Sequence, residues 1–350
     1  MTAYLLNCWY VAAFEAEVVS GAAMARTILN QRIAFFRDGS GVPIALADQC
    51  PHRFAQLHMG QVQDDVLECP YHGLRFDRSG SCVHNPHGDG VIPPQAKVRS
   101  FPITERYGLV WIWPGDASKA DPELLPDVAI IECDEPNAIA SGYMHTKANY
   151  ELVTDNLMDL SHADYIHRAT LNTGGSLSRM LPRVKARENS VNAHWSYRTE
   201  QVQPFFRGSM KDPDGPAYQS FDITWFPPSN LLLHVTARDV ELPEEADAIY
   251  STGHFLTPET DKSCHYFFVG RRNWDLQDAD LNAALRAGIM SAFADEDKPA
   301  LEAVQASMGD TTDIWSLNPV ILSCDPGPVH ARRMLQKLIS REREAPPATK

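Results

Sequence analysis

The sequence has no apolar run long enough to cross a membrane and no nucleotide-binding loop. No stretch approaches the roughly 20 apolar residues that a membrane-spanning helix requires. There is no Gly-x-Gly-x-x-Gly after a strand-like run and no Walker sequence, so we expect no flavin or nucleotide in this chain. The apolar opening segment Met1–Phe14 has no Lys or Arg before it, and a secretory signal is therefore not expected.

Basic residues and disulfide-like cysteine spacings are also scarce. Lys and Arg total 31 against 45 Asp and Glu, a net charge of −14, which argues against a nucleic-acid partner. Five of the seven cysteines are scattered without a framework spacing: Cys8, Cys82, Cys133, Cys264 and Cys324. Such usage is typical of a reduced protein, so we expect a cytoplasmic location.

The other two cysteines belong to a pattern that predicts a metal site. Cys50-x-His52 and Cys69-x-x-His72 each combine one thiolate ligand with one imidazole ligand. A Rieske [2Fe–2S] centre needs this arrangement, because one iron keeps two Cys and the other takes two His. A zinc site uses the same ligand types, although zinc spacings usually group Cys with Cys and His with His. We therefore predict a Rieske cluster, with zinc or four unrelated residues as alternatives.

A second pattern follows about 80 residues later. Asn156-Leu157-Met158-Asp159-Leu160-Ser161-His162 is followed by His167. The spacing Asp, two residues, His, four residues, His resembles the mononuclear-iron motif of Rieske non-haem iron oxygenases. The resemblance runs along nearly the whole chain. It is closest to the group that contains vanillate and dicamba O-demethylases and toluenesulfonate methyl-monooxygenase, and it implies one [2Fe–2S] cluster and one mononuclear Fe(II) per chain.

The two histidines of this motif do not share a face of a regular helix. His162 and His167 lie five positions apart, roughly 140° around an ideal helix. They can converge on one iron only if the helix distorts or ends between them. A 2-His-1-carboxylate triad leaves coordination positions open for oxygen chemistry, and the resemblance implies such a triad here.

The resemblance implies that the third iron ligand is an Asp in a Glu-Asp pair on a late helix. In this sequence the matching residue is Asp297, and Asp295 and Glu296 are the alternatives. Pro299 lies two residues further on. Since proline lacks an amide hydrogen, we expect it to remove the bond to the Asp295 carbonyl and kink the helix. Such a kink can move Asp297, so Asp295 and Glu296 stay open as alternatives.

Two residues beside the histidines are candidates for a catalytic role. Asp159 lies three residues before His162, so its carboxylate can accept a hydrogen bond from an iron-ligating imidazole. The resemblance implies that Asp159 also bridges to a Rieske histidine, matched by His72, of the neighbouring subunit in a head-to-tail homotrimer. A solvated helix Asp is the alternative. Asn156 resembles a family position near the iron, with a core or capping role as the alternative.

Substrate-contacting residues are harder to find, because a pocket is mostly apolar with few polar anchors. His254 matches a position that, in the dicamba-type relatives, lies in the substrate pocket and contacts a carboxylate. Asn230, His234 and Trp274 are weaker candidates.

The expected fold is α+β in two domains. Residues 1–120 are predicted to form an all-β Rieske domain, with the ligand pairs next to hairpin turns. Residues 121–345 are predicted to form a catalytic domain with an antiparallel sheet flanked by helices. Helical patterns cover Tyr150–His167, Leu281–Met308 and Val329–Arg341, and strand-like runs cover Ser190–Thr199, Phe221–Phe226, Leu231–Ala237, Tyr250–Leu256 and His265–Gly270.

The predicted function is the oxygenase component of a Rieske monooxygenase. The resemblance implies O-demethylation of a methoxy-substituted aromatic acid, or hydroxylation of an aryl methyl group, with O2. It also implies a separate NADH-dependent reductase, with or without a ferredoxin. Ring dihydroxylation, desaturation and non-aromatic hydroxylation are alternatives. From another class, the protein would be an electron carrier without its own catalytic iron, and the set His162, His167 and Asp297 argues against that.

Overall fold

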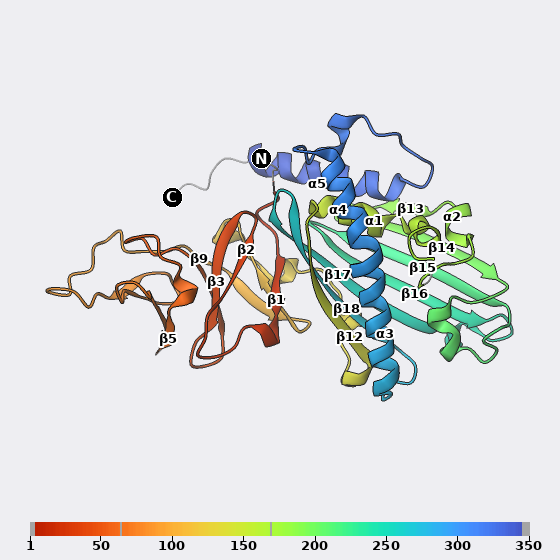
Figure 1. Ribbon diagram of the computed structural model, residues 1–350, viewed down its shortest axis with the longest axis horizontal. Helices are drawn as coiled ribbons and strands as arrows, with labels where there is room; N and C mark the ends of the chain where they lie inside the picture. The colour runs from red at the N-terminus through yellow and green to blue at the C-terminus, as the bar shows by residue number, and fades with distance from the viewer. Residues whose placement is uncertain (1–3, 64, 169, 345–350) are drawn as a thin grey trace. The chain divides into compact units, whose positions relative to one another are not determined.

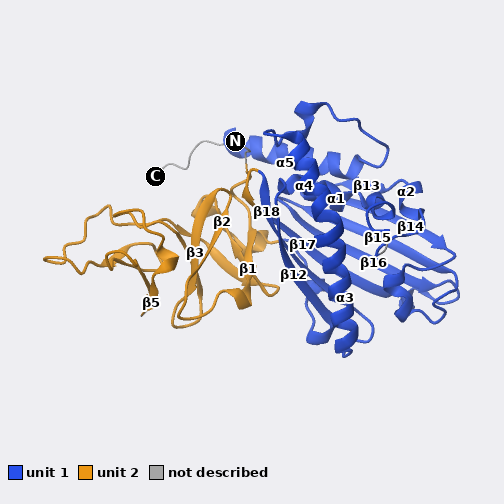
Figure 2. Cartoon of the chain, viewed as in Figure 1, with its two compact units in different colours: residues 1–3, 126–256, 262–350 blue, residues 4–125, 257–261 orange. Residues whose placement is uncertain are grey.

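The computed structural model of the protein describes residues 4–63, 65–168 and 170–344 (Figure 1). It divides into two compact units (Figure 2). The N-terminal unit consists of Tyr4–Leu125 and Thr257–Asp261, and the C-terminal unit of Pro126–Leu256 and residues 262–344. The division predicted after residue 120 lies close to this boundary. The later segment Thr257–Asp261 was not expected in the first unit, and backbone bonds such as that from Leu29 N–H to the Pro258 carbonyl (2.8 Å) hold it there.

The described residues of the N-terminal unit form three small antiparallel sheets. The first sheet has the strand order β1 (Tyr10–Phe14), β11 (Leu109–Ile112), β10 (Ile103–Arg106). The second has the order β2 (Met24–Ile28), β3 (Gln31–Arg37), β4 (Pro43–Ala47), β9 (Ser100–Phe101). The third has the order β5 (Gln61–Gln63), β6 (Val66–Glu68), β7 (Arg75–Phe76), β8 (Cys82–His84). Apolar side chains from the last two sheets pack around Cys50 and Cys69, so the cysteines of the first motif lie in a hydrophobic core. The predicted all-β character is confirmed.

The C-terminal unit contains one seven-stranded antiparallel sheet. In spatial order its strands are β12 (Ile139–Thr146), β18 (Ser263–Arg272), β17 (Ala248–Thr260), β16 (Asn230–Asp239), β15 (Ala217–Phe226), β14 (Val191–Thr199) and β13 (Arg183–Ala186). Side chains alternate along the strands, as in β15, where every second residue is buried. Helices lie on one face of this sheet, with α3 (Ala279–Ser291) running across β12 (Figure 1). The predicted α+β class is confirmed.

The helix predicted over Tyr150–His167 ends early. Helix α1 covers only Tyr150–Met158, because Asp159 adopts an extended conformation with φ −123° and ψ 96°. The Asp159 carboxylate accepts a bond from the Ser161 N–H (3.0 Å) and begins a short 3₁₀ turn, η7 (Leu160–Asp164). His162 lies in this turn and His167 lies after it, so the two histidines are not on one continuous helix.

The helix predicted over Leu281–Met308 is interrupted in its middle. Helix α3 is followed by a π-helical turn, η10 (Ala292–Asp297), and then by α4 (Lys298–Met308). In this turn the Lys298 N–H donates to the Phe293 carbonyl, five residues back. Pro299 lies in the first turn of α4, where a proline is tolerated. Such π turns are rare in proteins overall, but those that occur are often found at functional sites.

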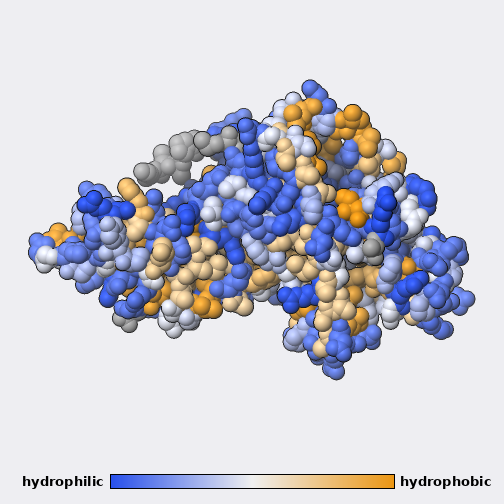
Figure 3. All heavy atoms as spheres, viewed as in Figure 1, coloured by the Kyte–Doolittle hydropathy of each residue, from blue (hydrophilic) through white to orange (hydrophobic). Residues whose placement is uncertain are grey.

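The last long helix, α5 (Pro326–Glu344), packs against α1. The segment between α4 and α5 carries an exposed apolar patch over the C-terminal unit (Figure 3), to which Leu317, Val320, Ile321 and Leu322 contribute. Within the described part of the chain, no helix is both long and apolar enough to span a lipid bilayer.

Candidate metal centres

Two loops of similar construction carry the first set of candidate ligands. The loop of residues 50–55 is closed by a bond from the Cys50 N–H to the carbonyl of its last residue (2.8 Å). The loop of residues 69–74 is closed in the same way from the Cys69 N–H (2.8 Å). Both thiols are buried. Each loop therefore holds a buried thiol and presents an imidazole two or three residues later.

The imidazoles of these loops lie next to each other, with the edge of one ring toward the other. The ring centroids of His52 and His72 are 4.6 Å apart. The Nδ1 atom of His72 is buried and has no hydrogen-bond partner among the described residues. Burial also raises the pKa of the Cys50 thiol to about 11. A metal centre resolves both features, because it takes up the free nitrogen and offsets the cost of a buried thiolate.

The spread of these four residues fits a two-iron cluster better than one zinc ion. A single zinc would hold every ligand atom at roughly 2.0–2.3 Å and bring them all close together. Here the two thiols belong to one buried cluster of side chains, and the two imidazole rings lie together, with their centroids 4.6 Å apart. A [2Fe–2S] cluster divides its ligands between two metal atoms.

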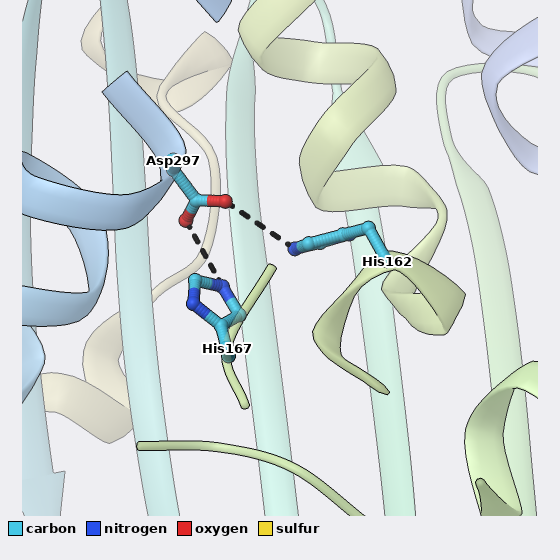
Figure 4. A group of neighbouring side chains, drawn as sticks. All are labelled: His162, His167 and Asp297. Atoms are coloured by element: carbon cyan, nitrogen blue, oxygen red, sulfur yellow. Dashed lines mark ion pairs between the residues drawn. The ribbon is translucent and has the colours of Figure 1, made fainter. Parts of the chain in front are cut away.

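The second set of candidate ligands converges on one point of the C-terminal unit (Figure 4). Asp297 Oδ2 lies 3.2 Å from His167 Nε2, and Asp297 Oδ1 lies 3.5 Å from His162 Nε2. The three side chains come from the turn η7, the segment after it and the end of the π turn η10. Because α1 ends at Met158, the side chains of His162 and His167 can approach each other. On one regular helix they would point in different directions.

The Nδ1 atoms of His162 and His167 already have hydrogen-bond partners, and these bonds fix the orientation of the two rings. His162 Nδ1 lies 2.6 Å from the Asp159 backbone carbonyl, and His167 Nδ1 lies 2.7 Å from Glu296 Oε2. Because a carbonyl oxygen only accepts, Nδ1 of His162 carries the proton and its Nε2 lone pair faces Asp297. For His167, burial lowers the pKa but bonds and charge from Asp297 and Glu296 raise it overall. Two imidazole Nε2 atoms around a carboxylate fit a bound cation.

The π turn separates the three neighbouring acids. Asp297 is buried and faces both histidines, while Glu296 lies behind His167 and also accepts a bond from Thr170 Oγ1 (2.6 Å). Asp295 is exposed and accepts a bond from Ser291 Oγ (2.9 Å). Of the three acids, the structure places Asp297 at the histidines. Asp297 lies beside both histidines, with Pro299 two residues further on in the first turn of α4.

Asn156 and Asp159 occupy different places around the triad. Asn156 Nδ2 donates to Asp297 Oδ1 (3.0 Å), so Asn156 holds the carboxylate rather than capping the helix. The Asp159 carboxylate was expected to accept a bond from His162, but its backbone carbonyl does so instead, because the carboxylate caps η7. That carboxylate lies in a group with Cys324 and Asp325.

A cavity of about 100 Å³ adjoins the triad and is mostly apolar. Its walls include Leu157, Leu160, Phe205, Phe206, Val235 and Phe293. An apolar cavity of roughly 150 Å³ is known to accept benzene, so this one is on the scale of a single aromatic ring.

His254 lies in the wall of this cavity, on β17 with Tyr250 and Thr252. Its Nδ1 is 2.7 Å from the hydroxyl oxygen of Tyr266, and its Nε2 has no partner among the described residues. Burial lowers the pKa of His254 to about 3, against a smaller opposing effect of Asp297. The ring is therefore neutral at ordinary pH.

The other three pocket candidates lie outside the cavity wall. On β16, Leu233 and Val235 face the cavity, so His234 and Asn230 point to the opposite face of the sheet. His234 Nδ1 there lies 2.8 Å from Ser251 Oγ. Trp274 packs behind the wall, with its ring centroid 5.5 Å from that of Phe206.

Sequence reasoning missed the residues that support the triad and shape the cavity. Glu296 was considered only as an alternative ligand. A usable signal was available, because a histidine that binds a metal through one ring nitrogen usually donates a hydrogen bond from the other, and Glu296 can accept it. Tyr266, which bonds His254, and the aromatic pair Phe205 and Phe206 carry no local signal, because their neighbours in space are distant in sequence.

Comparisons with known proteins agree with both centres. The chain matches the Rieske [2Fe-2S] domain over residues 8–102 and the vanillate O-demethylase oxygenase C-terminal domain over residues 146–341. It is 39% identical to the dicamba O-demethylase oxygenase component of Stenotrophomonas maltophilia, over 96% of this chain and 98% of that protein. It is 32% identical to the toluene-4-sulfonate monooxygenase system iron-sulfur subunit of Comamonas testosteroni, over 97% of this chain and 98% of that one.

A solved structure gives the same result. The crystal structure of dicamba monooxygenase bound to dicamba superposes with a TM-score of 0.89 at 37% identity, over 98% of this chain and 100% of that one. A Rieske domain joined to an oxygenase domain defines the class of Rieske non-haem iron oxygenases. Within that class, the chain belongs to the vanillate O-demethylase oxygenase family. The expected enzyme class, a monooxygenase component with a [2Fe–2S] cluster and a mononuclear iron, is confirmed.

Proposed function

We propose that this chain oxidises a methoxy or methyl carbon on a small, single-ring aromatic compound, with O2 and with electrons from a separate NADH-dependent reductase. The observation that carries the proposal is the position of His162, His167 and Asp297 at an apolar, ring-sized cavity. The names of the similar proteins, a dicamba O-demethylase and a toluene-4-sulfonate monooxygenase, support it. A ferredoxin between reductase and oxygenase stays a prediction, as does a cytoplasmic location.

The residues take the following roles in this proposal. The cluster would be held by Cys50, His52, Cys69 and His72, and the iron would be held by His162, His167 and Asp297. When bound, the cluster passes single electrons and the iron supports oxygen chemistry at its open positions.

The surrounding side chains position the triad and the substrate. Asn156 fixes the Asp297 carboxylate, Glu296 fixes the ring of His167, and the apolar walls exclude water and hold the aromatic ring. Oxidation of a methoxy carbon gives a hemiacetal, which collapses to a phenol and formaldehyde. O2 supplies one oxygen atom to the product and one to water, and NADH supplies the two electrons.

We propose in addition that the enzyme is a head-to-tail homotrimer in which Asp159 bridges to His72 of the neighbouring subunit. Supporting features lie on each unit separately. Asp159 and His162 line a groove together with the apolar Val320 and Ile321. On the N-terminal unit, Tyr71 beside His72 is 63% exposed. A closed ring of such contacts would cover both surfaces.

The test is a product screen with purified holoenzyme, a Rieske reductase and NADH. Methoxyarenes should yield formaldehyde and the matching phenol, and aryl methyl compounds such as toluene-4-sulfonate should yield the hydroxymethyl product. A cis-diol as main product would instead favour ring dihydroxylation. A purified protein that holds only the two irons of the cluster would favour an electron carrier.

A further inference from the structure

One histidine beside the Rieske ligand loops belongs to neither ligand pair. His87 lies in the loop of residues 85–91, which follows β8, and its Nε2 is 2.8 Å from the backbone carbonyl oxygen of His72. Because a carbonyl oxygen only accepts hydrogen bonds, Nε2 of His87 carries a proton and is the donor. A side chain outside the ligand set therefore binds the backbone of a cluster ligand directly.

The loop of residues 85–91 is a compact turn that holds the backbone of His87 in place. The side chain of Asn85 accepts a bond from the His87 N–H (3.1 Å) and donates one to the Val91 carbonyl (2.7 Å). The Gly90 N–H donates to the His87 carbonyl (2.9 Å). These bonds do not use the His87 imidazole, so the ring is left to reach the neighbouring ligand loop.

A second contact joins this turn to the ligand loop of residues 69–74. Gly73, directly after His72, has a φ of +71°, and a Cβ at this position would lie 3.2 Å from Pro86 Cγ. Glycine permits both the positive φ and the close approach. Pro86 thus packs against the ligand loop independently of the His87 ring, and we expect the two loops to stay together when that ring is changed.

The His87 ring lies on the imidazole side of the ligand set. It lines a hollow together with His52 and His72, and the described residues that form this hollow do not include Cys50 or Cys69. The ring centroids of His72 and His87 are 5.9 Å apart, with an angle of 66° between the rings. The iron that takes the two histidines of a Rieske centre would lie on this side.

We propose that His87 is a positioning residue that raises the reduction potential of the Rieske cluster through its hydrogen bond to the His72 carbonyl. Reduction by one electron makes the cluster more negative. The His87 N–H places the positive end of its dipole on the His72 peptide group, which stabilises the added charge in the same sense as hydrogen bonds to the cluster sulfurs do. The proposal needs the cluster only, and it is independent of the substrate and of the mononuclear iron.

The test is a redox titration of the purified holoenzyme at one fixed pH, followed by the absorbance of the cluster. His87→Phe keeps a ring but has no donor, and we expect its potential to fall. A single hydrogen bond changes an equilibrium constant by up to about tenfold, which is about 59 mV for a one-electron couple. His87→Gln, whose amide nitrogen reaches about as far as Nε2, should return the potential most of the way to that of the wild type.

His84→Phe is the matched control. His84 is also exposed and ends β8, three residues before His87, but its side chain forms no hydrogen bond with either ligand loop among the described residues. A potential in His87→Phe that falls no further than in His84→Phe overturns the proposal, and so does a potential in His87→Gln as low as in His87→Phe. Iron content is measured on the same samples. Loss of the cluster from His87→Phe would assign His87 to cluster retention instead, and would overturn the proposal as well. Because no substrate is present, none of these results depends on the proposed reaction.

Discussion

His162 and His167 present their Nε2 atoms to Asp297 because their Nδ1 atoms already have partners. We expect His162→Ala to lose one iron per chain and all turnover, while the Rieske absorption and electron resonance signal remain. The reason is that only two ligands would be left for that iron. Iron analysis together with the spectrum measures this. His194→Ala is the matched control, because His194 pairs with Asp222 instead (3.0 Å). Full iron content in His162→Ala would show that the triad is misassigned.

Glu296 acts on the same iron through His167. Replacing it by Gln keeps the size of the side chain but removes the charge that accepts the Nδ1 proton. Changes to such orienting residues typically cost about 10–100-fold in metal affinity, and we expect a loss of this size in Glu296→Gln. Fe(II) titration of the apoprotein measures it. Asp295→Asn is the control, since that exposed side chain contacts Ser291. Loss of iron in Asp295→Asn, with retention in Glu296→Gln, would reverse the assignment of the two acids.

At the scale of elements, the π turn η10 aims Asp297 into the site. Deleting Ala294 should turn η10 into ordinary helix and rotate the residues after it by about 100° relative to α3. Helix α4 is anchored independently, because Gln305 Oε1 accepts a bond from the Asn149 N–H (2.9 Å). We therefore expect a folded protein with its Rieske spectrum but without mononuclear iron.

Pro299→Ala is the matched change for that deletion. Pro299 follows the π turn and lies in the first turn of α4, so its missing amide hydrogen is not what places Asp297. We expect this variant to keep its iron and its activity. If Pro299→Ala loses iron as the deletion does, the proline itself and not the inserted residue positions the ligand.

The early end of α1 shows where reading elements from sequence reaches its limit. Leu160 and Ala163 continue the apolar spacing of α1, so periodicity alone extends the helix to His167. The helix stops because the Asp159 carboxylate accepts a hydrogen bond from the Ser161 N–H and begins the turn η7. The spacing of apolar residues does not reveal whether the chain continues as a helix or begins this turn. The strands were easier to predict, because the alternation of buried and less buried residues along strands such as β14 and β15 is a local signal.

At the scale of the whole molecule, the two ligand sets could be predicted because each lies in short motifs of distinctive residue types. The surroundings of the triad could not. The contact of His254 with Tyr266, the role of Glu296 behind His167 and the placement of Thr257–Asp261 in the N-terminal unit all join residues far apart in sequence. Nor did the motifs reveal that His234 and Asn230 face away from the cavity, since that depends on the register of β16.

Asp159 tests the proposed assembly. In Asp159→Asn the amide oxygen can still accept the Ser161 N–H, and the backbone carbonyl still accepts from His162, so both metal centres should remain. The variant loses the negative charge proposed to bridge to His72 of the neighbouring subunit. We expect activity to fall by more than the roughly 10–100-fold typical of an orienting residue.

The diagnostic measurement for Asp159→Asn is a single turnover. The reduced cluster should fail to reoxidise at the wild-type rate when substrate and O2 are added, as followed by its absorbance. Asp325→Asn is the control, because Asp325 belongs to the same group of side chains but caps the segment before α5 through the Leu322 N–H (2.6 Å). A normal reoxidation rate in Asp159→Asn would refute the proposed bridge between Asp159 and His72 of the neighbouring subunit. It would also remove the reason for arranging the subunits head to tail, because this residue pair is the one proposed to join the cluster of one subunit to the iron of the next.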